Sequence, residues 1–179
     1  AFVQFVLCII QSAILTLSYV GVAIVYGNEL PETGILTNYP MVEFYISIFL
    51  LMYAADAMGI MISCLVKKEE AANVLAPYIL IVQLIFSGIL FAMEGMADYI
   101  SYVMISRWGM EALGSIANLN DLPLKIQMTV PTVPHEFESR FDSTPEHLLT
   151  VWAVLFGFIV VFLLVGNILL HRVSKDTKG

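Results

Sequence analysis

The sequence predicts an all-α integral membrane protein with four membrane-spanning helices and one short helical segment that re-enters the membrane. Hydrophobic residues make up 59% of the 179 positions, and the mean hydropathy is +0.86. Soluble domains have about 45–50% apolar residues. Charge is also segregated, because four long stretches contain Asp56 as their one charged side chain. Buried helices of a large soluble protein would be the alternative, and this segregation disfavours it.

The predicted spans are residues 1–26, 44–66, 71–93 and 148–170. A helix rises ~1.5 Å per residue, so a 23-residue stretch reaches ~34 Å and can cross a hydrocarbon core of ~30 Å. The chain is hydrophobic from its second residue, and we therefore expect it to be a fragment of a longer chain. On this interpretation residues 1–179 form part of a single transmembrane domain.

The distribution of Lys and Arg predicts which side each connection occupies. Residues 67–70 and the tail after 171 are rich in basic side chains, which mark the cytoplasmic side of a membrane. The connections 27–43 and 94–147 are acidic and should be external, so the C-terminus should be cytoplasmic. The net charge of −7 disfavours nucleic acid as a partner. Loops without cysteine or an N-glycosylation site slightly favour a bacterial inner membrane.

The external region 94–147 contains the predicted re-entrant helix, residues 99–118. Apolar side chains recur there with helical spacing, and the segment is too polar to span but apolar enough to lie in an interface. Arg107 and Glu111 are four residues apart on its polar face and can pair. Ser143 or Thr144, followed by Pro145, is a plausible start for the last helix.

Polar residues inside the spans allow two interpretations. Asp56 could be a proton or cation site, or a hydrogen-bonded packing residue, and we favour the second. Gln4, Gln11 and Ser18 recur every seven residues, and this stripe should face protein whether it joins helices or lines a transport path.

No catalytic set is recognisable, and we expect this chain not to be an enzyme. The string HEFE at 135–138 lacks the second spaced histidine of a metalloprotease motif, so no metal site is predicted. A phosphate-binding GxxxxGK[ST] loop is also missing from the sequence, which implies no bound nucleotide cofactor here.

Two motifs carry a resemblance to a known family. FSGILF at 86–91, followed by ISRWGMEAL at 105–113, is similar to the last part of ABC-2 type transporter membrane domains, and most similar to the G subfamily of white and drug-exporting half-transporters. Ser106 stands where that family usually has proline before the arginine. The resemblance implies that the four spans correspond to spans three to six of the family domain.

The resemblance also implies roles for individual residues. Ile89 and Leu90 match an apolar valve, and Ile81, Leu84 and Ile85 match positions that line the substrate cavity, although lipid-facing or core roles are the alternative. Arg107, Trp108 and Glu111 would brace the re-entrant helix. The turn consisting of Lys67, Lys68, Glu69 and Glu70 would face the ATPase.

The function implied is the permease part of an ATP-driven ABC exporter that moves an amphipathic or lipid-like substrate by alternating access. Its partners would be an ABC ATPase domain or subunit carrying ATP and Mg²⁺, a second copy or a related half-transporter, and the lipid bilayer. Two alternatives remain open at this stage. One is an ion-coupled carrier or channel that uses Asp56, and the other is a membrane assembly subunit that transports nothing.

Overall fold

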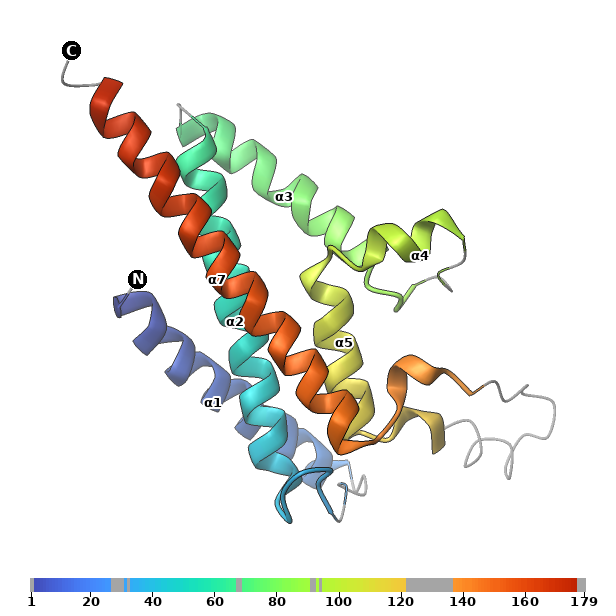
Figure 1. The fold of residues 1–179 in the computed structure, drawn as a ribbon. Coiled ribbons are helices and arrows are strands. Elements are labelled where there is room, and N and C mark those ends of the chain that lie inside the picture. Colours follow the sequence, from blue (N-terminus) through green and yellow to red (C-terminus); the bar gives the residue numbers. More distant parts are fainter. Residues whose placement is uncertain are drawn as a thin grey trace.

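A computed structural model describes residues 2–26, 31, 33–66, 69–90, 93, 95–121 and 137–176. Every regular element in these ranges is helical, which confirms the predicted all-α class (Figure 1). In chain order the elements are α1 (Phe2–Val25), α2 (Pro40–Leu65), α3 (Glu69–Ile85), α4 (Met96–Ser101), α5 (Ile105–Ile116), η1 (Leu119–Asp121), η2 (Ser139–Phe141) and α7 (Pro145–Asp176).

Three helices are long and apolar enough to cross a membrane, and they match three of the four predicted spans. Within the described residues they are Val3–Val25, Pro40–Leu65 and Pro145–His171. A proline stands at the start of both α2 and α7, where its missing N–H would have no helical partner. The Thr144 carbonyl accepts the Leu148 N–H at 3.1 Å, so α7 begins where the sequence predicted.

The remaining predicted span, the third in chain order (71–93), is wrong as a continuous helix because α3 ends at Ile85. Its 17 residues reach only about 26 Å, which is shorter than a hydrocarbon core of ~30 Å. Ser87 ends the helix by donating from Oγ to the Leu84 carbonyl at 2.7 Å and accepting the Ile89 N–H at 3.2 Å. Gly88 then adopts φ +78°, a left-handed conformation that favours glycine.

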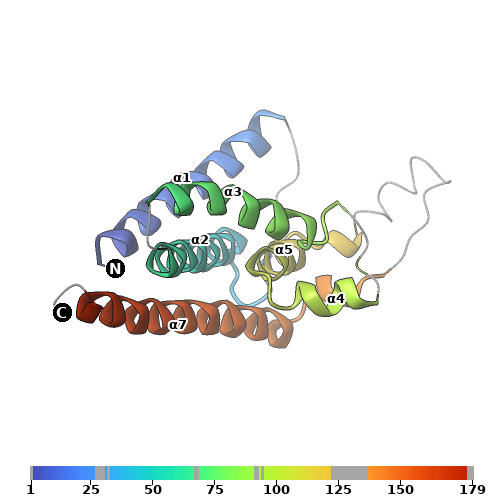
Figure 2. The same cartoon turned by 90° about the horizontal axis from the view of Figure 1, so that it is seen from above.

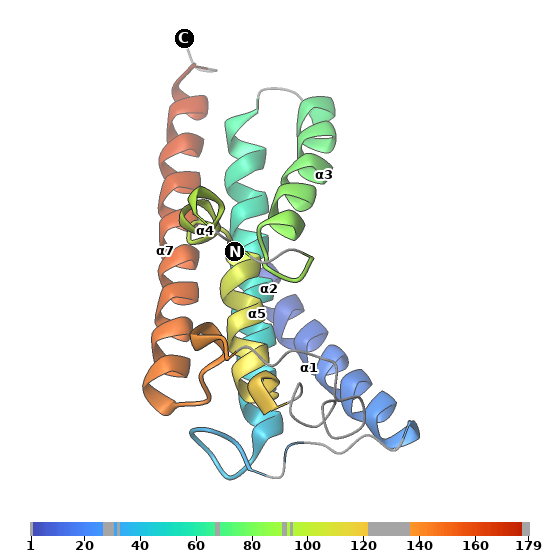
Figure 3. The same ribbon diagram turned by 90° about the vertical axis from the view of Figure 1, so that its right-hand side faces the viewer.

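Two shorter helices, α3 and α5, each pack beside a different half of α2. We call the end where α2 and α7 begin the loop end, and the end where α2 passes to α3 the turn end. Helix α3 follows the half of α2 nearest the turn end, where the Gln83 amide approaches the Met58 sulfur. Helix α5 follows the half nearest the loop end, where Gly109 lies against Leu51 (Figures 1 and 3). Seen from above, α2 and α5 lie between α7 on one side and α1 and α3 on the other (Figure 2).

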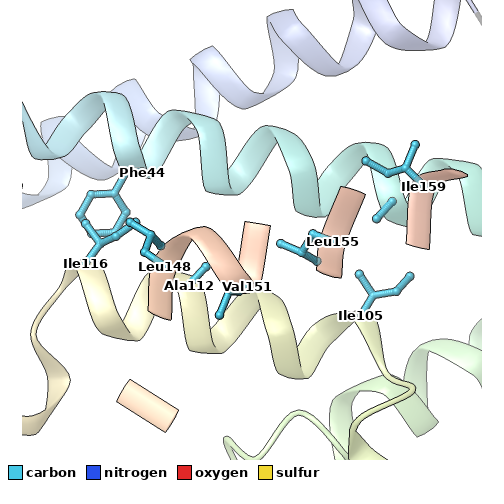
Figure 4. Packing of buried hydrophobic residues seen from close by; sticks show 9 residues of the cluster. Phe44, Ile105, Ala112, Ile116, Leu148, Val151, Leu155 and Ile159 are labelled. Atoms are coloured by element: carbon cyan, nitrogen blue, oxygen red, sulfur yellow. The ribbon is translucent and has the colours of Figure 1, made fainter. Parts of the chain in front are cut away.

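The apolar core is formed where α2, α5 and α7 meet (Figure 4). Small residues allow these helices to approach closely, because a Cβ on Gly109 would overlap the Leu51 side chain. One polar contact crosses the same interface, where Trp152 Nε1 donates to Ser47 Oγ at 2.8 Å. The buried apolar residues of the cluster are Phe44, Ala54, Ile105, Ala112, Ile116, Leu148, Val151, Leu155 and Ile159.

The predicted helix 99–118 is wrong as one continuous helix. It is divided into α4 and α5 by residues 102–104, and Met104 there has an extended backbone. The apolar stripe assigned to it therefore crosses a break, and Ile100 and Val103 are exposed whereas Ala112 is buried. Helix α5 is buried on most sides because it packs against both α2 and α7.

Candidate functional site

Arg107, near the start of α5, is the centre of a buried polar cluster. Its guanidinium pairs with Asp98 Oδ1 at 2.8 Å, and it also donates to the Asp98 carbonyl at 3.1 Å and to Ser101 Oγ. The same guanidinium lies over the Tyr102 ring, 3.6 Å from the ring centroid. These contacts hold α4 against the start of α5. Arg107 therefore joins the two helices that the non-helical residues 102–104 separate.

Glu111 connects this cluster to the last helix. Its carboxylate lies 3.6 Å from Arg107 Nε, so the predicted pair forms, but inside the protein and not on an exposed polar face. Its other oxygen is 3.3 Å from His147 Nε2 in the first turn of α7. Arg107 Nε and Glu111 Oε2 are buried without a hydrogen-bond partner among the described atoms. Sequence reasoning missed His147, because its partner is 36 residues away in the chain.

Burial raises the pKa of the Glu111 carboxyl above its ordinary value. Coulombic attraction to His147, Arg107 and Arg140 opposes that rise.

Trp108, the third residue assigned to the brace, donates from Nε1 to the Tyr102 carbonyl at 2.9 Å. The three predicted brace residues are thus near one another: Arg107 and Trp108 contact the residues between α4 and α5, and Glu111 connects Arg107 to α7.

A second joint links the end of α3 to the start of α5. The Ser106 N–H donates to Gln83 Oε1 at 3.0 Å, and Ser106 Oγ donates to the Gln83 carbonyl at 2.5 Å. The Ser106 N–H is one of the first amides of α5, which have no partner within a helix. Gln83 was not predicted as a site residue. The available signal was Ser106 itself, since the proline expected there has no N–H to donate.

Replacing Gln83 with leucine is expected to destabilise the chain by about 1–3 kcal/mol, because the Ser106 N–H loses its buried acceptor. A second substitution, Ser106→Pro, removes that N–H and should recover part of the loss. Thermal unfolding in detergent of the two single variants and the double variant measures the coupling. Simple additivity of the two single effects would contradict the joint.

The residues matched to a cavity lining and valve are uncovered in the single chain. Ile81, Leu84 and Ile85 on α3, and Ile89 and Leu90 in the turn after it, are all exposed. We call residues 86–90 the valve turn. Gln83 is buried, in contrast, and faces the bundle. The roles given to the five apolar residues remain predictions.

Asp56 lies between α1 and α2, half-buried, and accepts a hydrogen bond from Cys8 Sγ at 2.9 Å. This is the contact expected of a hydrogen-bonded packing residue. Of the predicted polar stripe, Gln4 is half-buried, whereas Gln11 and Ser18 are exposed in the single chain, so its contact with protein stays a prediction. The buried face of α1 consists of Cys8, Ser12, Thr16 and Ala23, which are small and let α1 approach its neighbour.

The turn assigned to the ATPase is only partly visible. Lys67 and Lys68 lie outside the described residues, as does the side chain of Glu69. Glu70 is exposed and, with Val66, Val74 and Tyr78, lines an open hollow of about 580 Å³ at the turn end. The histidine of the HEFE string also lies outside the described residues.

Three long apolar helices and one shorter apolar helix among the described residues define a multi-pass membrane protein. The family model described as "ABC-2 type transporter" matches residues 1–117. The chain therefore belongs to the ABC-2 type transporter family and is part of the membrane domain of an ABC transporter.

One relative is the ABC transporter ATP-binding/permease protein Rv1747 of Mycobacterium tuberculosis. It is 28% identical over 164 residues, which cover 88% of this chain. The chain spans only 17% of that relative's length. No solved structure matches the chain.

Proposed function

We propose that the chain is the permease part of an ATP-driven exporter that works by alternating access. ATP and Mg²⁺ would be bound and hydrolysed by an ABC ATPase domain or subunit outside these residues. Family membership supports this proposal, and so does the relative whose name describes both an ATP-binding and a permease protein. Basic residues near 67–70 and in the tail favour a cytoplasmic turn end, which would place the ATPase there.

The observation that carries the proposal is that α3 ends at Ile85, inside an apolar run, and is followed by the non-helical valve turn. Non-helical backbone at membrane depth is tolerated where it is buried in protein or lines a water-filled cavity, but not against lipid. Ile89 and Leu90 in this turn are each 54% exposed in the single chain. A second copy, or a related half-transporter, would cover this side and enclose a path between the two valve turns.

The favoured substrates are amphipathic or lipid-like compounds. All five residues assigned to the path and valve are apolar, and each has at least 38% of its surface exposed in the single chain. Apolar constrictions can close a path by excluding water, and they contact the hydrophobic part of an amphiphile without desolvating a charge. Leu84 and Ile85 would contact substrate before it reaches Ile89 and Leu90.

Replacing Leu90 with alanine is expected to change the rate of ATP-dependent export without preventing assembly, because it widens the constriction. Transport of a fluorescent amphiphile into inverted vesicles measures the rate, with the ATPase present. The matched control is Leu149→Ala, since Leu149 is a similarly exposed leucine on α7. Export kinetics that are the same in both variants and the parent would refute the valve assignment.

Asp56→Asn separates this proposal from an ion-coupled carrier. An ATP-driven exporter should keep ATP-dependent transport in this variant, since Asp56 contacts Cys8 and is remote in sequence from the valve turn. Loss of transport together with indifference to ATP depletion would favour the carrier. A subunit that only assists assembly would show no transport change in any of these variants.

A further inference from the structure

The short helix η2 is held firmly against the loop-end half of the bundle. Asn120 Nδ2 donates to the Glu138 and Phe141 carbonyls at 3.1 Å each, and Asn120 Oδ1 accepts the Glu138 N–H at 3.1 Å. The Phe141 ring is buried against Gly114 of α5, where a Cβ would overlap it. These contacts place η2 at a defined position beside α5.

From this position the side chain of Arg140 reaches the valve turn. Its guanidinium contacts Gly88 so closely that a Cβ on that glycine would overlap Nη1. Gly88 also has φ +78°, a left-handed conformation that favours glycine, and the close guanidinium is a second reason for a residue without a Cβ at this point of the turn. Ile89 and Leu90 follow directly, and the Arg140 contact therefore lies at the base of the predicted valve.

Arg140 is itself fixed on the side away from the turn. Its Nε pairs with Glu138 Oε2 at 2.5 Å, and its guanidinium carbon lies 5.0 Å from the centroid of the Phe141 ring. Its backbone carbonyl is 3.0 Å from His147 Nε2. Only 17% of the Arg140 side chain is exposed. A side chain anchored in this way can restrain the turn it touches, because moving it would break its contacts with Glu138 and Phe141.

We propose that Arg140 is a positioning residue that holds the valve turn through its contact with Gly88. The inference rests on the proposed function only where it treats residues 86–90 as a valve, because the contact between Arg140 and Gly88 does not depend on transport. Through Arg140, a shift of η2 or of the first turn of α7 would be transmitted to Ile89 and Leu90. The segment that follows the re-entrant helix would then control the position of the valve.

Cysteine accessibility tests the contact between Arg140 and Gly88, which we call the clamp, without relying on transport. The assay uses Leu90→Cys in the full transporter, in which Cys8 and Cys64 have been replaced by alanine, and a membrane-impermeant maleimide as the probe. Replacing Arg140 with alanine is expected to raise the modification rate about three- to tenfold, as for the loss of one contact of ordinary strength. Arg140→Lys should give a smaller rise, because its shorter and rounder cation reaches Gly88 less well.

A variant on the other side of the contact supplies an independent test. Gly88→Ala would push the guanidinium away, so it should also raise the modification rate. Combining it with Arg140→Ala should raise the rate by less than the product of the two single effects, since both changes remove the same contact and only the strain of alanine at φ +78° is separate from it. The matched control is Glu146→Gln, which neutralises an exposed carboxylate on the first turn of α7 and should leave the rate unchanged.

The outcomes separate the clamp from the proposed function. If no Arg140 or Gly88 variant changes the modification rate, or if the two effects add fully, the clamp is refuted whatever happens to export. If Arg140→Ala does not assemble, the Arg140→Lys and Gly88→Ala rates decide in the same way. A raised rate with unchanged export would keep the clamp and refute the valve function of the turn.

Discussion

Glu43→Ala is expected to lower the free energy of unfolding by roughly 3 kcal/mol, because hydrogen bonds to a charged group contribute ~1.5–3 kcal/mol each and the partly exposed donors regain some bonding to water. Glu43 is fully buried in the first turn of α2. Its Oε1 accepts the N–H groups of Leu36 and Thr37 at 2.7 and 2.6 Å, and its Oε2 accepts that of Ile35 at 2.8 Å. Removing the carboxylate leaves three amides unpaired and releases the segment before α2.

The effect can be measured by thermal unfolding of the purified protein in detergent. Glu43→Gln should be less damaging than Glu43→Ala, because it retains one acceptor oxygen and most of the volume. Glu146→Gln provides the control, as an exposed carboxylate in the corresponding turn of α7. If the Glu43 variants are as stable as this control, the buried carboxylate does not hold the segment.

Arg107→Ala should cost about 3–5 kcal/mol, the range for removing one partner of a buried ion pair. The change leaves Glu111 buried without its cation and takes a donor from Asp98 and Ser101. The loss should appear as a lower unfolding temperature, and as increased proteolysis at the break between α4 and α5.

A double variant separates the cost of the unpaired charge from the loss of packing. Arg107→Met combined with Glu111→Gln removes both charges and keeps most of the volume, so it should be more stable than Arg107→Ala. Asp121→Asn, at an exposed position of η1, is the control for an ordinary charge change. A double variant as unstable as Arg107→Ala would show that packing, and not charge pairing, dominates at this site.

Local patterns were sufficient to predict much of the fold. Three spans could be located because lipid excludes charge, so apolar stretches between charged connections mark the helices that cross. The start of α7 was visible in the Thr144–Pro145 pair, since proline favours the first turn of a helix. The Arg107–Glu111 pair followed from their separation of four residues, which places both side chains on one helix face.

The end of helix α3 at Ile85 could not be predicted from hydropathy. Apolar residues continue from Ala71 to Met93 through the point where α3 ends, so composition carries no signal for its end. A turn formed by Ser87 and Gly88 ends the helix, and Arg140 packs against it from a distant segment. A glycine in an apolar span predicts close packing as readily as a turn.

The class of the protein, its three long spans and its family motifs could be read from the residues, because each depends on a single segment. The burial of α5 between α2 and α7, the place of His147 in the Arg107 cluster and the contact of Arg140 with Gly88 required the folded chain. These features depend on residues 36 and 52 positions apart that the packing of helices brings together. A single sequence contains no record of such a contact until the helices that carry both partners have been placed.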